Sequence, residues 1–78
     1  MSYVNLSRSR IGDADLACFQ DLPDVEVLDL SGTNVTDDGL EHLKGLSGLQ
    51  VLILDGAQVT AAGVARLKRA LPGTTILH

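Results

Sequence analysis

Hydrophobic positions recur along this 78-residue chain with a period of 24 residues. A fixed period of this size predicts a solenoid, in which each unit buries its apolar side chains against its neighbours. Five sets of apolar residues share the spacing: Val4, Leu28, Leu52 and Ile76; Leu6, Leu30 and Leu54; Ile11, Val35 and Val59; Leu16, Leu40 and Val64; Phe19, Leu43 and Leu67.

The period divides the chain into residues 1–24, 25–48 and 49–72, and a terminal strand at residues 73–78. No insertion interrupts the register, so residues 1–78 are expected to form a single domain. Within each unit, apolar residues first alternate with their neighbours, which predicts a strand. A turn and then apolar residues at helical spacing follow, which predicts a short helix.

Helix starts and ends are marked by particular residues. Thr36 and Thr60 are N-cap candidates, and Asp37 follows the first of them, where negative charge suits the helix dipole. Pro23 and Pro72 lie where two of the helices should end. We therefore expect an α/β fold of four parallel strands and three helices. Strands are about 4.8 Å apart and helices about 8–10 Å apart, so the stack should curve with its strands on the concave side.

The pattern L-x-x-L-x-L-x-x-A-x-V at residues 49–59 resembles the leucine-rich repeat, as does its counterpart at residues 25–35. Residues 1–11 are a looser copy. The continuation Val35-Thr36-Asp37-Asp38-Gly39-Leu40 resembles a Thr-Asp-x-Gly-Leu variety common in bacterial repeat arrays and the cysteine-containing repeats of F-box substrate receptors. The resemblance implies a short curved solenoid that binds other proteins.

Two features depart from that family's pattern. The ninth repeat position, usually Asn or Cys, is occupied by Ser9, Thr33 and Ala57. Ser and Thr can still bond the turn backbone, whereas Ala57 leaves its turn to backbone or water. No dedicated capping unit is recognisable, although His78 gives the last strand a polar end, so both edge strands are expected to be exposed.

Strand alternation also predicts the surface of the concave face. Val and Ile occupy several positions that should face solvent, where polar residues are usual. Such a patch marks a contact surface or an aggregation liability, and the β-propensity of Val and Ile is a further explanation. Asp29 should add direction by accepting hydrogen bonds from a partner. The expected protein-binding residues are Tyr3, Asn5, Val27, Asp29, Val51, Ile53, Asp55 and Leu77.

The net charge of −4 disfavours nucleic acid and anionic membranes as partners. Cys18 is the only cysteine, so no disulfide forms within the chain, and a reducing compartment is favoured. No signal peptide or membrane-length apolar stretch is recognisable. The sequence thus predicts a cytoplasmic protein.

Catalytic and metal sites are poorly supported. Cys18 and His42 share a helix position in adjacent units and could pair as nucleophile and base, but the convex helix face should offer no pocket. Adding Glu41 still falls short of a metal-ligand set. We expect no enzyme activity, no cofactor and no metal.

Three functions remain open at this point. The leading one is a protein-interaction module that uses its concave face. The second is a structural element that self-associates through its uncapped ends or its patch, or belongs to a longer repeat array. The third is the substrate-recognition part of a larger enzyme complex.

Overall fold

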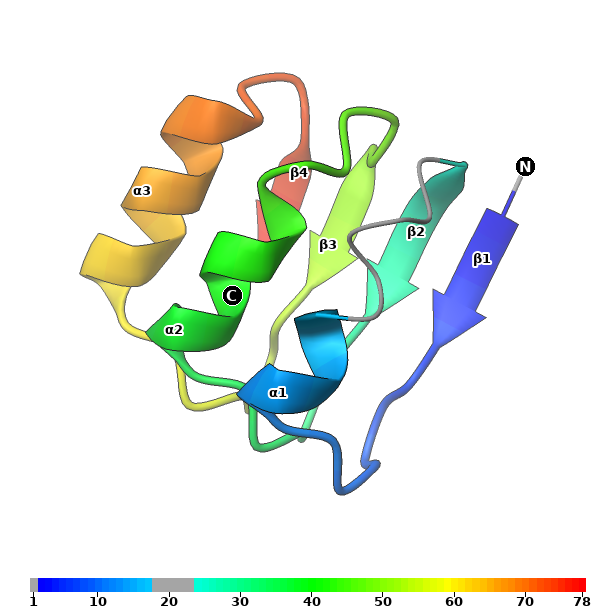
Figure 1. Ribbon diagram of the computed structural model, residues 1–78, viewed down its shortest axis with the longest axis vertical. Coiled ribbons are helices and arrows are strands. Elements are labelled where there is room, and N and C mark those ends of the chain that lie inside the picture. The colour runs from blue at the N-terminus through cyan, green and yellow to red at the C-terminus, as the bar shows by residue number, and fades with distance from the viewer. Residues whose placement is uncertain (1, 18–23) are drawn as a thin grey trace.

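The computed structural model describes residues 2–17 and 24–78, in which strands and helices alternate (Figure 1). The strands are β1 (Ser2–Asn5), β2 (Val25–Asp29), β3 (Val51–Ile53) and β4 (Thr75–Leu77). The helices are α1 (Asp13–Leu16), α2 (Asp37–Leu40) with a 3-10 turn (Glu41–Leu43), and α3 (Ala61–Ala70).

One sheet contains all of these strands, in the order β1-β2-β3-β4 and with every pair parallel. The register advances by one 24-residue period per strand, because Leu28 pairs with Leu52 and Leu52 with Ile76. The pairing of β1 with β2 is irregular only between Ser2 and Tyr3. The expected division into units is therefore the register of the sheet.

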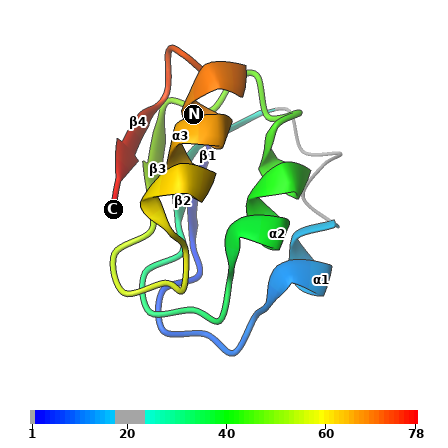
Figure 2. The same ribbon diagram turned by 90° about the vertical axis from the view of Figure 1, so that its left-hand side faces the viewer.

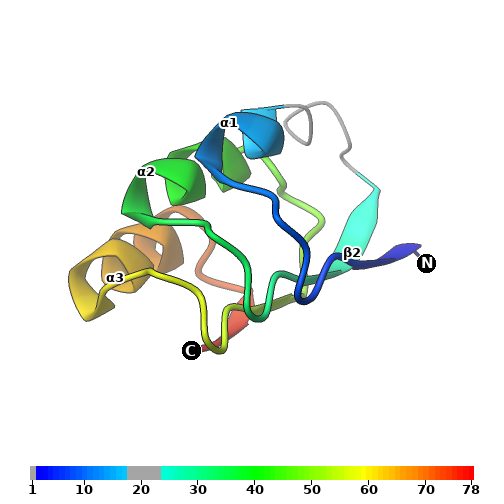
Figure 3. The same cartoon turned by 90° about the horizontal axis from the view of Figure 1, so that it is seen from below.

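The sheet and the helices form two layers. The three helices lie side by side over one face of the sheet, and none of the described elements covers the other face (Figures 2 and 3). Four parallel strands in one row and three helices in the other make a short solenoid, as the periodicity predicts.

The core lies between the two layers. Leucines at the repeated strand positions of the middle units are fully buried, among them Leu28, Leu30, Leu52 and Leu54. Their counterparts in the outer strands, Val4, Leu6 and Ile76, are only half-buried, contrary to the expectation that every member of these sets lies inside. The outer strands have a neighbour on one side only, so their apolar side chains stay partly accessible.

Helix lengths differ between units. The pattern places Leu40, Leu43 and Leu46 on one helix, but the helical segment ends at Leu43. Leu46 lies in the turn that follows and is nevertheless fully buried. Helix α3 runs for ten residues and ends before Pro72, as expected. The expectations for Cys18, Phe19, Leu22 and Pro23 concern residues outside those that the structure describes.

Candidate protein-binding face

The uncovered face of the sheet carries the side chains at alternate strand positions. Tyr3 is 58% exposed and Leu77 is 48% exposed, whereas Val27, Val51 and Ile53 are half-buried. Strand pairing places Tyr3 beside Val27, Val27 beside Val51, and Ile53 beside Leu77. These five residues, the apolar band, cross all four strands. The two ends of the band are exposed and its middle is half-buried, a difference that the sequence pattern does not predict.

Polar residues border the apolar band at the ends of the strands. The Asn5 side-chain oxygen Oδ1 accepts hydrogen bonds from the Ser7 amide (3.0 Å) and the Ser7 hydroxyl (2.8 Å). Asp29 Oδ1 accepts the equivalent bonds from Ser31 at 3.0 and 2.7 Å. One oxygen of Asp29 thus accepts hydrogen bonds within a local turn, and the expectation that Asp29 also accepts hydrogen bonds from a partner stays a prediction. Asp55 is exposed.

The turns after the strands follow the expected difference between units. The Ser9 hydroxyl donates to the carbonyl three residues earlier at 2.6 Å, and the Thr33 hydroxyl donates to its equivalent at 2.7 Å. Ala57 has only the backbone bond from its N–H to the Leu54 carbonyl, 3.0 Å long. The prediction for this position is confirmed. These turns fix the strand ends and hence the polar border of the face.

Carboxylates link each helix start to the next unit. Asp13 Oδ1 accepts from the Thr36 amide at 2.7 Å, and its Oδ2 accepts from the Thr36 hydroxyl at 2.5 Å. Asp37 binds Thr60 in the same way, at 2.8 and 2.5 Å. The hydrogen bonds from the Thr60 side chain and backbone lower the pKa of Asp37 below its ordinary value. We call these two contacts the Asp–Thr ladder.

Gly39 of the Thr-Asp-x-Gly-Leu segment, and Gly63 at the equivalent position in the next unit, have a packing role in the same ladder. A Cβ on Gly39 would overlap the Asp13 carboxylate, and a Cβ on Gly63 would overlap that of Asp37. Thr36 and Thr60 also cap their own helices, accepting from the Asp38 amide at 3.3 Å and the Gly63 amide at 3.2 Å. These positions therefore join one unit to the next, a role that the N-cap and helix-dipole interpretations of the sequence did not include.

The first unit lacks the threonine and satisfies its helix start by itself. Gly12 stands where Thr36 and Thr60 stand in the later units, and Asp15 stands at the position of Gly39. The Gly12 amide donates to Asp15 Oδ2 at 2.9 Å. In the later units this backbone N–H, of Thr36 or Thr60, donates to a carboxylate of the previous unit. In the first unit it donates to a carboxylate of the same unit.

In the last unit, side chains bond backbone carbonyl groups. The Val35 carbonyl accepts from the backbone N–H of Gln58 in the next unit. The equivalent carbonyl of Val59 lies 3.3 Å from His78 Nε2 instead. The Lys68 ammonium donates to the Thr74 carbonyl at 2.5 Å. Side chains therefore bond individual backbone groups at this end, while the apolar side chain of Ile76 stays half-buried.

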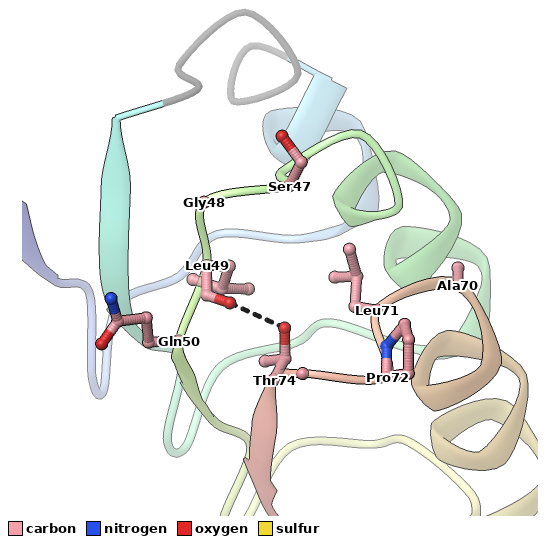
Figure 4. A pocket seen from close by; sticks show the side chains of 9 residues that line it. Ser47, Gly48, Leu49, Gln50, Ala70, Leu71, Pro72 and Thr74 are labelled. Carbon is pink, nitrogen blue, oxygen red and sulfur yellow. Dashed lines mark hydrogen bonds between the residues drawn. The ribbon is translucent and has the colours of Figure 1, made fainter.

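A groove of about 460 Å³ lies between the segments that precede β3 and β4 (Figure 4). Residues 47–50 and 70–74 line it, and the Thr74 hydroxyl spans them by donating to the Leu49 carbonyl at 2.7 Å. No acid, base or thiol belongs to this lining. The groove therefore offers shape without the groups that acid–base or nucleophilic chemistry requires.

Other chemistry is equally sparse in the part of the chain that the structure describes. No group of three His, Cys, Asp or Glu residues is arranged to hold a metal ion there. None of its helices is long and apolar enough to cross a bilayer. The ion pair between Lys44 and Glu41, 2.6 Å long, is a local contact between residues three positions apart, and the hydrogen bond from Lys44 lowers the Glu41 pKa. The proposed pairing of Cys18 with His42 concerns a residue outside the described ranges.

Parallel strands in 24-residue register, each followed by a turn and a helix, define a solenoid of strand–turn–helix repeats. Residues 1–59 match the sequence profile of the leucine rich repeat. The chain belongs to the leucine-rich repeat family, whose domains generally mediate protein–protein interactions and are typically non-enzymatic. Among curated proteins, none matches the chain.

Proposed function

We propose that this chain is a protein-interaction module that binds through the uncovered face of its sheet. The observation that carries the proposal is the apolar band, with Tyr3 58% exposed at one end and Leu77 48% exposed at the other. The outer face of a half-exposed sheet is normally polar. Contiguous apolar surface on that face marks a contact site.

The β-propensity of Val and Ile explains part of this surface, because such residues suit strands whether or not they are exposed. It does not explain Leu77, which is not a β-branched or aromatic residue, or the high exposure of Tyr3; both lie on edge strands and remain accessible. Edge strands are usually protected by charged side chains. Tyr3 and Leu77 instead continue the apolar band to both edges of the sheet. This distribution favours a contact role over propensity alone.

The border of the band indicates the chemistry of the partner. Asp29 is half-buried and retains one oxygen outside its local turn, and Asp55 is exposed. No Lys or Arg occupies an outward strand position. We therefore expect a partner that presents apolar side chains with a basic group beside them, and not nucleic acid or an anionic membrane. The proposed binding residues remain Tyr3, Asn5, Val27, Asp29, Val51, Ile53, Asp55 and Leu77.

The Thr-Asp-x-Gly-Leu character of the repeats is also inferred, and the Asp–Thr ladder supports it. A cytoplasmic location is inferred from the single cysteine of the chain, since reducing compartments keep thiols free.

A photo-crosslinking amino acid placed at two positions tests the binding face. With the probe at Tyr3, on the apolar band, we expect covalent capture of a partner from the native lysate. With the probe at Ala62, exposed on the helix layer, the same partner should be absent. The substitutions Tyr3→Ser and Leu77→Ser together should abolish capture by affinity pull-down while the circular dichroism spectrum is kept. Equal capture from both probe positions would rule out the sheet face as the site.

A further inference from the structure

Within the part of the chain that the structure describes, β1 and β4 are the edge strands, and each turns some backbone groups away from its single neighbouring strand. The Leu6 amide donates to the Asp29 carbonyl at 2.8 Å, so even-numbered residues of β1 turn their backbone groups toward β2. Backbone groups alternate in direction along a strand, so those of Tyr3 and Asn5 point away from the sheet. On β4 the Leu77 carbonyl accepts from the Leu54 amide at 2.7 Å, which leaves the groups of Ile76 on the free edge.

These two edges are complementary to each other in register. Each strand pairs with the next 24 residues on, as Val51 pairs with Thr75 and Leu52 with Ile76. One further strand at the same step would match β1 of a second copy, with its Val4 beside Ile76. Both side chains are half-buried and already pack against the core. Pairing would therefore extend the sheet and cover apolar surface at both ends.

Charge favours a head-to-tail arrangement over two-fold ones. Helix α3 carries Arg66, Lys68 and Arg69, whereas α1 at the other end carries Asp13 and Asp15. Pairing of like edges would bring like charges together, and pairing of β4 with β1 brings opposite charges to the same side. The effect is expected to act at long range and to weaken with salt.

Lys68 occupies an acceptor of the free β4 edge. Within the chain, the Thr75 amide donates to the Gln50 carbonyl at 2.8 Å. One repeat later, the equivalent donor would be the Tyr3 amide of the second copy, and its acceptor would be the Thr74 carbonyl. The Lys68 ammonium holds that carbonyl at 2.5 Å. A lysine at an edge is a known means of opposing strand addition.

We propose that the β4 edge is a docking site for the β1 edge of a second copy, and that Lys68 keeps it closed. Three helices cover four strands, so the helix position above the joined strands stays vacant and the interface is small. Interfaces of this size are weak and transient. The wild-type chain should therefore be monomeric except at high concentration.

Sedimentation equilibrium over a concentration series tests the proposal, with Lys68→Met as the opening variant. Freeing the carbonyl should lower the dissociation constant of self-association about fivefold, the effect of one hydrogen bond. Arg69→Met is the matched control, because it removes the same charge from the same helix without freeing the carbonyl. Its dissociation constant should equal that of the wild type or be higher. Adding Asn5→Pro to Lys68→Met should abolish association, since proline removes an outward amide that β1 does not use internally. Asn5→Ala, which keeps that amide, should not.

Three results would overturn the proposal. They are a Lys68→Met variant that stays as monomeric as the wild type, an Arg69→Met variant that associates equally, and association that survives Asn5→Pro in a chain whose circular dichroism is unchanged. The last would point to the apolar band as the self-association surface, and Tyr3→Ser with Leu77→Ser would then remove it. The edge proposal and the binding-face proposal thus fail separately.

Discussion

The Asp37 carboxylate holds the start of the following helix through Thr60, accepting from its amide at 2.8 Å and from its hydroxyl at 2.5 Å. Asp13 and Thr36 repeat the contact one unit earlier. The units are therefore joined by directed polar bonds at one edge of the helix layer, in addition to their shared leucine core.

The Asp37 contact predicts a dependence of stability on acid. Its pKa is lowered in the folded chain by the hydrogen bonds from Thr60, so on acidification the unfolded chain takes up the proton first. The stabilisation is complete above the unfolded pKa of about 3.9 and is lost as pH falls through the lower folded value. Urea unfolding between neutral pH and pH 3 should show a steeper acid loss in the wild type than in Asp37→Asn. Parallel pH curves for the two chains would contradict this contact.

Gly63→Ala should destabilise the chain although alanine is the better helix former. Overlap of the new Cβ with the Asp37 carboxylate is expected to cost about 1–3 kcal/mol, more than the ~1 kcal/mol gained in helix propensity. Combining it with Asp37→Ala should recover much of the loss, a coupling measured by a double-mutant cycle of urea unfolding. Gly45→Ala, where nothing lies within 4 Å of the added atom, is the control without a clash. Additive effects in the cycle would exclude the overlap as the cause.

Ala57→Thr should stabilise the third turn. The equivalent Thr33 hydroxyl donates to a backbone carbonyl at 2.7 Å, and Ala57 leaves that carbonyl with its backbone bond alone. A gain of about 0.5–1 kcal/mol in the free energy of unfolding is expected. Thr33→Val, which keeps the shape and removes the hydroxyl, should cost about 1–3 kcal/mol because the site is buried. A loss of stability in Ala57→Thr would show that the half-buried site lacks room for the larger side chain.

Arg8→Gly should also stabilise the chain. Arg8 has a φ of 59°, in the left-handed region, and glycine occupies the same turn position in the next two units, as Gly32 (φ 67°) and Gly56 (φ 78°). Relief of the left-handed penalty is worth roughly 1 kcal/mol, measured as a rise in the urea midpoint. Gly32→Ala should have the opposite sign and a similar size. If Arg8→Gly lowers stability, the Arg8 side chain that packs near Gly32 contributes more than its backbone costs.

The sequence predicts the layers and register of this fold because every unit repeats the same apolar positions. Leu28 lies beside Leu52 as the 24-residue period requires. It predicts the ends less well, because Val4 occupies a core position in the pattern and is only half-buried. Burial depends on having a neighbour on both sides, which the pattern within a single unit does not express.

The polar contacts were the hardest part to predict. Asp37 at a helix start has a sufficient local explanation in the dipole, so nothing in its own unit indicates a partner 23 residues away. The signal that was present is Gly39 and Gly63 in the first turn of their helices, where glycine weakens a helix unless close packing requires it. Asp29 likewise suggests an open acceptor until the local bond to Ser31 is seen.

The Asp–Thr ladder makes the three units unequal as building blocks. Residues 25–48 contain both partners of the Asp–Thr contact. Thr36 and Gly39 accommodate the carboxylate of the previous unit, and Asp37 binds the threonine of the next one. The first unit supplies a carboxylate but has no threonine to receive one. The third unit has Ala61 at the position of Asp37, so it has no carboxylate to bind a following unit. In-frame duplication of residues 25–48 would therefore insert a fully bonded unit, so the middle of this chain is a module from which longer arrays can be assembled.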